Sequence, residues 1–406
     1  MKNWLFVSLA LFSTFIFLSC SQKKTKPSSN SLTLALRSGL YSDVVKSCLL
    51  DFERENNVLC IVQDYSEDDL HKKILENDGT IDLCMADSSW AQELAANGSL
   101  FDLKKEGYAL DRDIIDATKK AGYSGEKLLL APYYGNVTVL LFNKFIIKEA
   151  GFKPEDINSI DDILEICRSS NKRHNLGFMY RGDTANNIVV DFLPILLSYG
   201  GWVVDSENNP TVSTSEFLEA VEAYKALIKT GRAAKKDDLV AAIANKAAAM
   251  GIGWPGWYTP TRNSSMDYLA ITGRSSKGSK PRNANIYGVW MLGVPSASKK
   301  HTLSVKLLDY LMSPSVQRET VIKGGVPCRY SSLCAPEVQK KFPQYTMILS
   351  ALEGGVYRPA MQEWSKFYTI LGAHLKAIFS EDADAETELK SAQSELESML
   401  KTEKNE

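Results

Sequence analysis

The stretch that decides the fold is residues 58–87, VLCIVQDYSEDDLHKKILENDGTIDLCMAD. Its two ends, 58–65 and 80–87, are apolar runs of strand length, and residues 67–77 between them have the spacing of a helix. A helix that joins two short strands is typical of a crossover connection in a parallel sheet. The sequence therefore predicts an α/β fold built around a mainly parallel sheet.

Polar segments follow several of the strand-like runs. These segments are RSG (37–39), ADSSW (86–90) and YYGN (133–136). Ligands of open α/β sheets bind at the loops beyond the carboxyl ends of the strands. We therefore expect these three segments to contribute to a binding site.

The composition is that of an ordinary globular protein. Of the 406 residues, 44% are hydrophobic and 24% are charged, and this length favours two or three domains. The 47 basic and 49 acidic residues give a formal net charge of −2 and form no basic stripe, so we expect no nucleic-acid partner. A core of this size needs no metal or disulfide framework.

The N-terminal segment has the features of a signal peptide. Lys2 precedes an apolar run, 4–18, which has the length of a signal-peptide core rather than of a membrane span. We therefore expect residues 1–19 to be a signal peptide and the mature protein to be exported.

The end of this run, FLSC, resembles the lipobox of bacterial lipoproteins, although leucine is usual where Phe17 stands. The resemblance implies that Cys20 is lipidated after cleavage, and the polar residues 20–30 then form a flexible tether. Such a protein would touch the membrane through its lipid anchor only. The alternative is a plain signal peptide that is cut elsewhere.

The other cysteines show no metal-site spacing. Cys60 and Cys84 lie in apolar runs and are interpreted as small core residues. Cys328 and Cys334 can close a short loop in an oxidising compartment, and the sequence leaves open whether they form a disulfide.

Motifs of catalysis are missing from the sequence. It contains no HExxH, no GxSxG, no GxxxxGK[ST] and no GxGxxG, and its four histidines are scattered. We therefore expect that the protein is not an enzyme and that it uses no metal and no cofactor.

Several longer motifs occur in a fixed order along residues 31–406. They are ADSSWAQELAANGSLFDL (86–103), PYYGNVTVLLFNKFIIKEAGF (132–152), LPILLSYGGWVVD (193–205), KAAAMGIGWPGW (246–257), YGVWMLGVPSASKKHTLSVKLLDYLMSPSVQRE (287–319), GGVPCR (324–329) and YRPAMQEW (357–364). Each motif alone is a weak signal. Their shared order resembles that of the bacterial extracellular solute-binding proteins of family 1, the receptors of sugar ABC importers that include the maltose- and trehalose-binding proteins.

This resemblance implies the two-lobe periplasmic-binding-protein fold of the type II kind. Each lobe would be a mainly parallel sheet flanked by helices, and several chain crossings would form a hinge. The first lobe would comprise residues 31–135 plus 287–335, and the second 136–286 plus 336–406. A monomer would bind its ligand between the lobes, and the permease subunits of the importer would read their closure.

The resemblance also assigns ligand-binding residues at the first-lobe side of the cleft. Asp87 stands where the family has an acid that binds sugar hydroxyls, and its alternative role is to cap the following helix. Trp90 belongs to the same motif and is alternatively a packing residue. Asn136 stands where the maltose-binding protein has an acidic residue. Of its neighbours Tyr133 and Tyr134, we expect Tyr133 to face the cleft.

The stretch GIGWPGWY (251–258) places three aromatic residues on a turn, because Gly and Pro interrupt helices and strands. The family has an aromatic platform for a sugar ring here. We expect Trp257 to be this platform, with Trp254 second and Tyr258 packed beneath, although the motif itself does not decide which of them contacts ligand.

Three further residues complete the expected site. Arg37 ends the first strand and can bind a hydroxyl or the carboxylate of an acidic sugar. Arg358 occupies a position in the YRPAMQEW motif that tends to face the cleft in relatives, and Trp364 is a second candidate in the same motif. For each of the three, the alternative is a structural role at the surface or in the core.

The leading hypothesis is therefore a lipid-anchored receptor that binds a sugar, a disaccharide or oligosaccharide by expectation, for an ABC importer. One alternative is the same fold with an acidic or phosphorylated solute, which Arg37 and Arg358 make conceivable. Another is a surface adhesin or sensor that uses the same lobes without transport.

Overall fold

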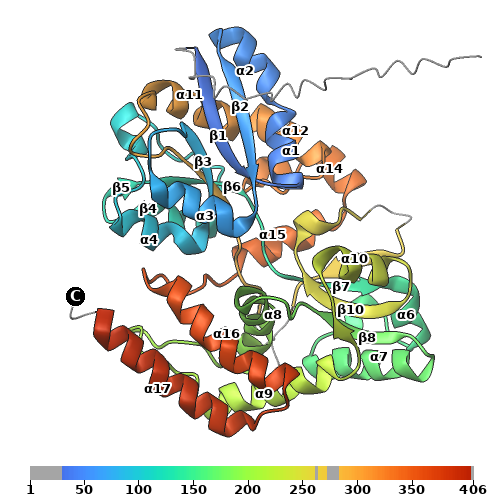
Figure 1. Ribbon diagram of the computed structural model, residues 1–406. Helices are drawn as coiled ribbons and strands as arrows, with labels where there is room; N and C mark the ends of the chain where they lie inside the picture. Colours follow the sequence, from blue (N-terminus) through green and yellow to red (C-terminus); the bar gives the residue numbers. More distant parts are fainter. Residues whose placement is uncertain (1–29, 261–263, 272–282, 404–406) are drawn as a thin grey trace, which may run out of the picture.

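The computed structural model describes residues 30–260, 264–271 and 283–403. Two five-stranded sheets, each flanked by helices, form two lobes that lie one above the other in Figure 1. The predicted two-lobe α/β fold is confirmed.

The first sheet has the order β2-β1-β3-β12-β6. Its strands are β1 (Ser31–Arg37), β2 (Leu59–Tyr65), β3 (Leu83–Asp87), β6 (Leu130–Tyr134) and β12 (Trp290–Gly293). β1 pairs parallel with β2 and β3, whereas β12 is antiparallel to both β3 and β6. β1, β2, β3 and β6 therefore point the same way, and the helix between β2 and β3 is the crossover that the sequence predicts.

The second sheet has the order β11-β7-β10-β8-β9. Its strands are β7 (Val139–Asn143), β8 (Leu176–Tyr180), β9 (Arg232–Ala233), β10 (Ala248–Gly253) and β11 (Met266–Leu269). β8 pairs parallel with β9 and β10, and β7 is antiparallel to β10 and β11. A small hairpin, β4 (Tyr123–Ser124) and β5 (Lys127–Leu128), lies apart from both sheets.

The helices around the first sheet are α1 (Leu40–Lys46), α2 (Leu49–Asn56), α3 (Glu67–Glu76), α4 (Ala91–Ala96), α5 (Asp116–Lys119), α11 (His301–Met312), α12 (Pro314–Ile322), α13 (Tyr330–Leu333), α14 (Pro336–Lys341) and α15 (Tyr345–Glu353). Short 3₁₀ turns are η1 (Ser88–Trp90), η2 (Leu103–Glu106) and η3 (Lys120–Gly122). α3 begins where it does because the side chain of Ser66 accepts a hydrogen bond from the backbone N–H of Asp69. This cap places Glu67 in the first turn of α3, at the edge of the cleft.

The helices around the second sheet are α6 (Lys144–Glu149), α7 (Ile160–Lys172), α8 (Ala185–Ser198), α9 (Ser215–Ile228), α10 (Lys236–Ala244), α16 (Trp364–Ser380) and α17 (Ala385–Glu403), with 3₁₀ turns η4 (Pro154–Asp156) and η5 (Pro255–Trp257). α8 is buried along most of its length and packs against α9 and α16. Its N-terminus is capped by Thr184. In Figure 1, α8 lies at the side of the second lobe that faces the first lobe.

Three crossings of the described chain join the lobes, and backbone hydrogen bonds tie them together. The first crossing bonds to the second through Thr138 N–H to Ile286 O (2.9 Å) and Gly288 N–H to Asn136 O (3.0 Å). The second bonds to the third through Tyr287 N–H to Val356 O (2.9 Å). The hinge is therefore a small hydrogen-bonded ribbon.

The helices α14 and α15 pack with the first lobe. The expected division of the chain puts residues 336–406 in the second lobe, but α14 and α15 both contact α13, and α15 also contacts α5, which are helices of the first lobe. The apolar side chains of Val338, Ile348 and Leu352 are buried there. The rest of the expected division stays a prediction.

The described cysteines are free thiols. Cys328 is buried, and burial raises the pKa of its thiol to about 12, whereas Cys334 is exposed beyond α13. Cys20 and the predicted signal peptide lie outside the described residues. Among the residues that are described, no helix is both long and apolar enough to cross a membrane.

A close backbone contact in the second lobe gives a test of its packing. A Cβ at Gly231, in the turn between α9 and β9, would lie 1.8 Å from the carbonyl oxygen of Phe178, so Gly231→Ala must push this turn away from β8. We expect this variant to lose about 1–3 kcal/mol of unfolding free energy or more. Gly182→Ala is the matched control, because the nearest atom to its Cβ would be 3.4 Å away. Equal urea midpoints for the two variants would contradict this packing.

Candidate functional site

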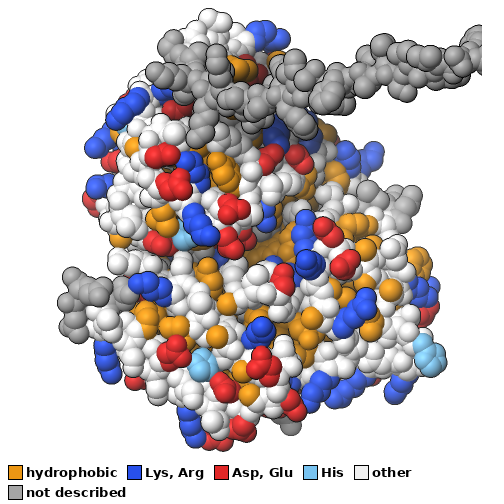
Figure 2. Space-filling view, viewed as in Figure 1, with side chains coloured by type: hydrophobic (Ala, Val, Ile, Leu, Met, Phe, Trp, Pro, Cys, Tyr) orange, Lys and Arg blue, Asp and Glu red, His pale blue; other side chains and the backbone are white. Residues whose placement is uncertain are grey.

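A cavity of about 890 Å³ lies between the two lobes. Residues of β1, α3 and β3 line it from the first lobe, and residues of α8, α10 and η5 line it from the second. Figure 2 shows the corresponding hollow between the lobes, with basic and acidic side chains around its rim. The volume falls in the range of small-molecule sites.

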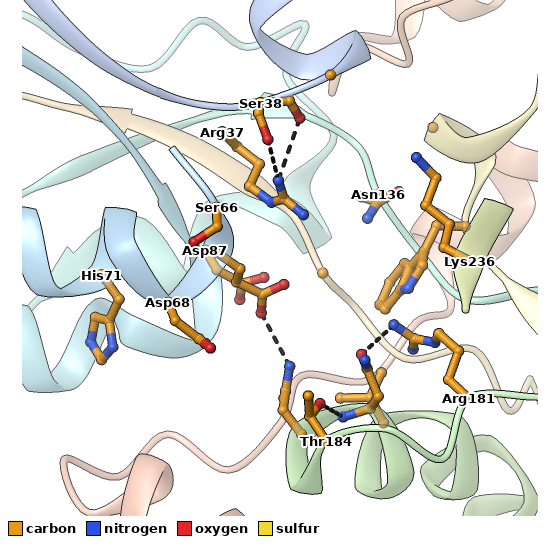
Figure 3. A pocket seen from close by; sticks show the side chains of 18 of the residues that line it. Arg37, Ser38, Ser66, Asp68, His71, Asp87, Asn136, Arg181, Thr184 and Lys236 are labelled. Atoms are coloured by element: carbon orange, nitrogen blue, oxygen red, sulfur yellow. Dashed lines mark hydrogen bonds between the residues drawn. The ribbon is translucent and has the colours of Figure 1, made fainter. Parts of the chain in front are cut away.

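Two cleft residues stand at the carboxyl ends of first-lobe strands, where the sequence predicts them. Arg37 is the last residue of β1 and Asp87 the last residue of β3, and both line the cavity. The parallel strands bring these ends to the same edge of the sheet, so two residues that are far apart in the sequence become neighbours in the site (Figure 3).

Asp87 lines the cavity and also has the capping role that the sequence left as its alternative. Its carboxylate accepts a hydrogen bond from the backbone N–H of Ser89 (2.8 Å) and so caps η1. The same carboxylate forms an ion pair with Arg358, and both side chains are about 95% buried. Asp87 therefore lines the cavity as a partner of an arginine rather than as a free carboxylate.

Arg358 lies on the third crossing, next to the ribbon of the hinge. Its neighbour Tyr357 donates a hydrogen bond to the backbone oxygen of Thr118 (2.9 Å), which fixes the crossing against the first lobe. The Nε atom of Arg358 is buried and has no hydrogen-bond partner among the described residues. Arg358 thus lines the cavity and keeps one N–H donor, at Nε, that is free to bond to a ligand.

Arg181, a cleft residue that sequence reasoning missed, forms the charged part of the second-lobe wall. It follows β8, and its Nε donates to both carboxylate oxygens of Asp191 on α8 at 3.2 Å. Burial raises the pKa of Asp191, and the Arg181 charge opposes this shift. The same strand-end rule that selects Arg37 could have selected Arg181.

Trp257 and Trp254 both line the cavity. Trp257 is partly exposed, and the guanidinium of Arg181 lies 4.9 Å from the centre of its ring. Trp254 is 7% exposed and packs on Gly288, where a Cβ would lie 2.7 Å from ring atoms. Tyr258 is partly buried against the first-lobe core and is not among the residues that line the cavity.

Asn136 lies on the first crossing and faces the cavity (Figure 3). Its side chain is 3% exposed, and its Oδ1 atom has no hydrogen-bond partner within the described part of the chain. A buried polar atom without a partner costs free energy, so this oxygen is suited to accept a hydrogen bond from a ligand.

Three residues that the resemblance assigns to the ligand do not line the cavity. Trp90 stacks on His71 with ring centres 4.6 Å apart, behind the cavity wall. Tyr133 is fully buried in the first-lobe core, and Trp364 stacks on Phe367 (5.6 Å) in the second-lobe core. In this structure all three have the packing role that the sequence left as their alternative, because a motif does not specify which face of its element a side chain occupies.

Glu67 is a second cleft residue that sequence reasoning missed. Asn186 Nδ2, on α8 of the second lobe, donates a hydrogen bond to Glu67 Oε1 across the cleft (3.2 Å). Burial raises the pKa of Glu67 and the Asp87 charge raises it further, whereas Arg358, Arg37 and Arg181 oppose the shift. No motif marks Glu67, because in the sequence it reads as an ordinary acidic residue in the first turn of a helix.

Comparison with known proteins identifies the family. A family model described as bacterial extracellular solute-binding protein matches residues 49–344. The chain belongs to this family. The predicted resemblance is confirmed, and the protein is a transport-type solute-binding protein and not an enzyme.

Curated relatives and solved structures agree with this assignment. A probable amino-acid ABC transporter periplasmic-binding protein of Sinorhizobium fredii is 24% identical over 306 residues, which cover 72% of this chain and 69% of the relative. The maltose-bound MalE3 structure of T. maritima has a TM-score of 0.81 at 19% identity and covers 91% of this chain and 99% of its own. A ribitol complex of a solute-binding protein from Agrobacterium radiobacter has a TM-score of 0.79 at 20% identity, covering 92% and 100%. At such identities the solved structures show the shared fold.

The buried pair Asp87–Arg358 gives a test of the cavity wall. Asp87→Asn keeps an oxygen that can cap η1 but leaves the Arg358 guanidinium without its counter-charge, so we expect a loss of about 3–5 kcal/mol in unfolding free energy. The double variant Asp87→Leu with Arg358→Met removes both charges and should recover most of that loss. Urea unfolding measures both values. A single variant as stable as the unaltered protein would refute the pairing.

Proposed function

We propose that this protein binds a sugar or polyol in the cavity between its lobes and delivers it to the permease of an ABC importer. The observation that carries the proposal is the composition of the cavity wall. Indole rings and hydrogen-bonding groups line one cavity, and both lobes contribute to it.

The chemistry of a polyhydroxylated ligand matches such a wall. Hydroxyl groups both donate and accept hydrogen bonds, and here Asn136 Oδ1 can accept while the Nε atoms of Arg37 and Arg358 can donate. The C–H faces of a sugar ring pack on flat aromatic surfaces such as Trp257. Burying a tryptophan can contribute up to about 4–6 kcal/mol at ~25 cal/mol per Å² before ordering costs. A micromolar site needs about 8 kcal/mol, so an aromatic platform and a few hydrogen bonds suffice.

Proteins of similar fold support this ligand class. Structures that match this chain were solved with maltose, ribitol and D-mannitol. The curated relative from Sinorhizobium fredii is instead named as a probable amino-acid receptor, so amino acids are the competing class in any binding test.

The mechanism that we propose is a shift between open and closed lobes. Glu67 of the first lobe and Asn186 of the second already meet across the cleft. A ligand that contacts both lobes stabilises the closed arrangement by its differential affinity, and the permease would recognise that arrangement.

The proposal includes export and anchoring. Residues 1–19 would be removed as a signal peptide, a lipid on Cys20 would hold the protein at the membrane, and residues 20–30 would act as a tether. Fully extended, this tether would span at most about 40 Å, which lets a monomeric receptor reach a permease in the same membrane.

A ligand screen tests the proposed class. We expect sugars or polyols to raise the melting temperature of the purified chain, and calorimetry to give an affinity that falls about tenfold or more in Trp257→Ala, because the aromatic platform is lost. Trp202→Ala is the matched control, since Trp202 is partly buried in the second lobe away from the cavity. The proposal fails if amino acids stabilise the protein and every carbohydrate does not.

Anchoring has a separate test. When the full chain is produced in a bacterial host, we expect it to partition into the detergent phase of a Triton X-114 extraction, because acyl chains on Cys20 are apolar. Cys20→Ser should move the protein to the aqueous phase, whereas Ser21→Ala should not. Detergent partitioning that is unaffected by Cys20→Ser would exclude this anchor.

A further inference from the structure

Three arginines line the cavity, and two of them have a carboxylate partner. Arg358 is paired with Asp87, and Arg181 is paired with Asp191. Both pairs are largely buried, as expected for charges that are removed from water. The charges of these two arginines are therefore already matched within the protein.

Arg37 differs from the other two. Among the described residues, no carboxylate oxygen lies within 4.0 Å of its guanidinium. Its Nη1 donates to the hydroxyl of Ser38 (2.7 Å), and the guanidinium lies 6.0 Å from the ring centre of Trp290. Its Nε atom is buried and has no hydrogen-bond partner in the described part of the chain. Arg37 thus keeps a free N–H donor and has no ion-pair partner within 4.0 Å among the described residues, although its charge acts on Glu67 at longer range.

The carboxylates on this wall of the cavity have other partners. Asp87 forms an ion pair with Arg358 and caps η1, and Glu67 accepts a hydrogen bond from Asn186. Figure 3 shows the Arg37 side chain reaching from the end of β1 into the cavity, on the wall that also carries Asp87. A ligand that enters the cavity therefore meets the donors of Arg37 directly.

The shape and charge of a guanidinium select one kind of partner. Its planar donors match a carboxylate, which can accept two parallel hydrogen bonds. The single negative charge of a carboxylate balances the single charge of Arg37, whereas a phosphate dianion carries a second charge that would add to the repulsion from Asp87 and Glu67. We propose that the preferred ligand is a sugar acid whose carboxylate binds Arg37. This inference rests on the proposed function and names the ligand class within it.

Calorimetric titration of the full chain, purified in a detergent without a sugar headgroup, tests the proposal. The probes are galacturonate, glucuronate and gluconate, their neutral counterparts galactose, glucose and sorbitol, and also maltose and glucose 6-phosphate. We expect at least one acid to bind about tenfold or more tighter than its neutral counterpart, which is the size expected for hydrogen bonds to a charged group.

Substitution assigns the effect to Arg37. We expect Arg37→Gln to lower the affinity for the acid by about tenfold or more and to leave the neutral sugar within about twofold. Arg232→Gln is the matched control, because it removes the same charge from an exposed position on β9 outside the cavity. Arg37→Lys keeps the positive charge but lacks the planar pair of guanidinium donors, so it should lower the affinity for the acid by an intermediate amount. This variant replaces Arg37→Gln if that one does not fold.

Each remaining outcome overturns the inference in a distinguishable way. Neutral sugars that bind as tightly as the acids, or acid binding that Arg37→Gln leaves unchanged, refute the role of Arg37 and leave the proposed function standing. A preference for glucose 6-phosphate refutes the carboxylate assignment. If the ligand screen described above finds that amino acids bind and no carbohydrate does, both the inference and the proposed function are refuted.

Discussion

The rest of the structure depends on the backbone hydrogen bonds between the three crossings. They run from Thr138 to Ile286, from Gly288 to Asn136 and from Tyr287 to Val356. These bonds hold together the three chain segments that run from one sheet to the other. As a result, the carboxyl ends of the first-lobe strands face the helix N-termini and loops of the second lobe. Without this ribbon the two walls of the cavity would have no fixed relation to each other.

The second constraint on the cavity is that its buried charged side chains form ion pairs. Buried ions are costly unless they are matched, and the pairs Asp87–Arg358 and Arg181–Asp191 follow this rule. The first pair connects the end of β3 to the third crossing, so it links the site to the hinge. Arg37, which is only partly buried, lines the same cavity without a carboxylate partner within 4.0 Å among the described residues, and local exceptions to such rules are expected at functional sites.

Part of the candidate site could be read from the sequence by a simple rule. The rule is that polar residues at the carboxyl ends of strands contribute to a binding site, and it predicted Arg37 and Asp87. The aromatic turn at 251–258 predicted Trp254 and Trp257, and all four residues line the cavity. The same rule would have reached Arg181. Trp90 and Tyr133 lie in segments that the same rule selected, and Trp364 was assigned from its motif. All three are packed away from the cavity, because neither the rule nor a motif specifies which side of an element faces the cleft.

The amino-acid sequence was sufficient to predict the fold class and the family, because alternating strands and helices leave few arrangements and the motifs keep a fixed order along residues 31–406. Only the tertiary structure decided which side chains meet. Glu67 and Asn186 are 119 residues apart and touch across the cleft, and Asp87 and Arg358 are 271 residues apart and form a buried pair. Such contacts depend on how the two lobes close on the hinge, and no local pattern of residues encodes that geometry.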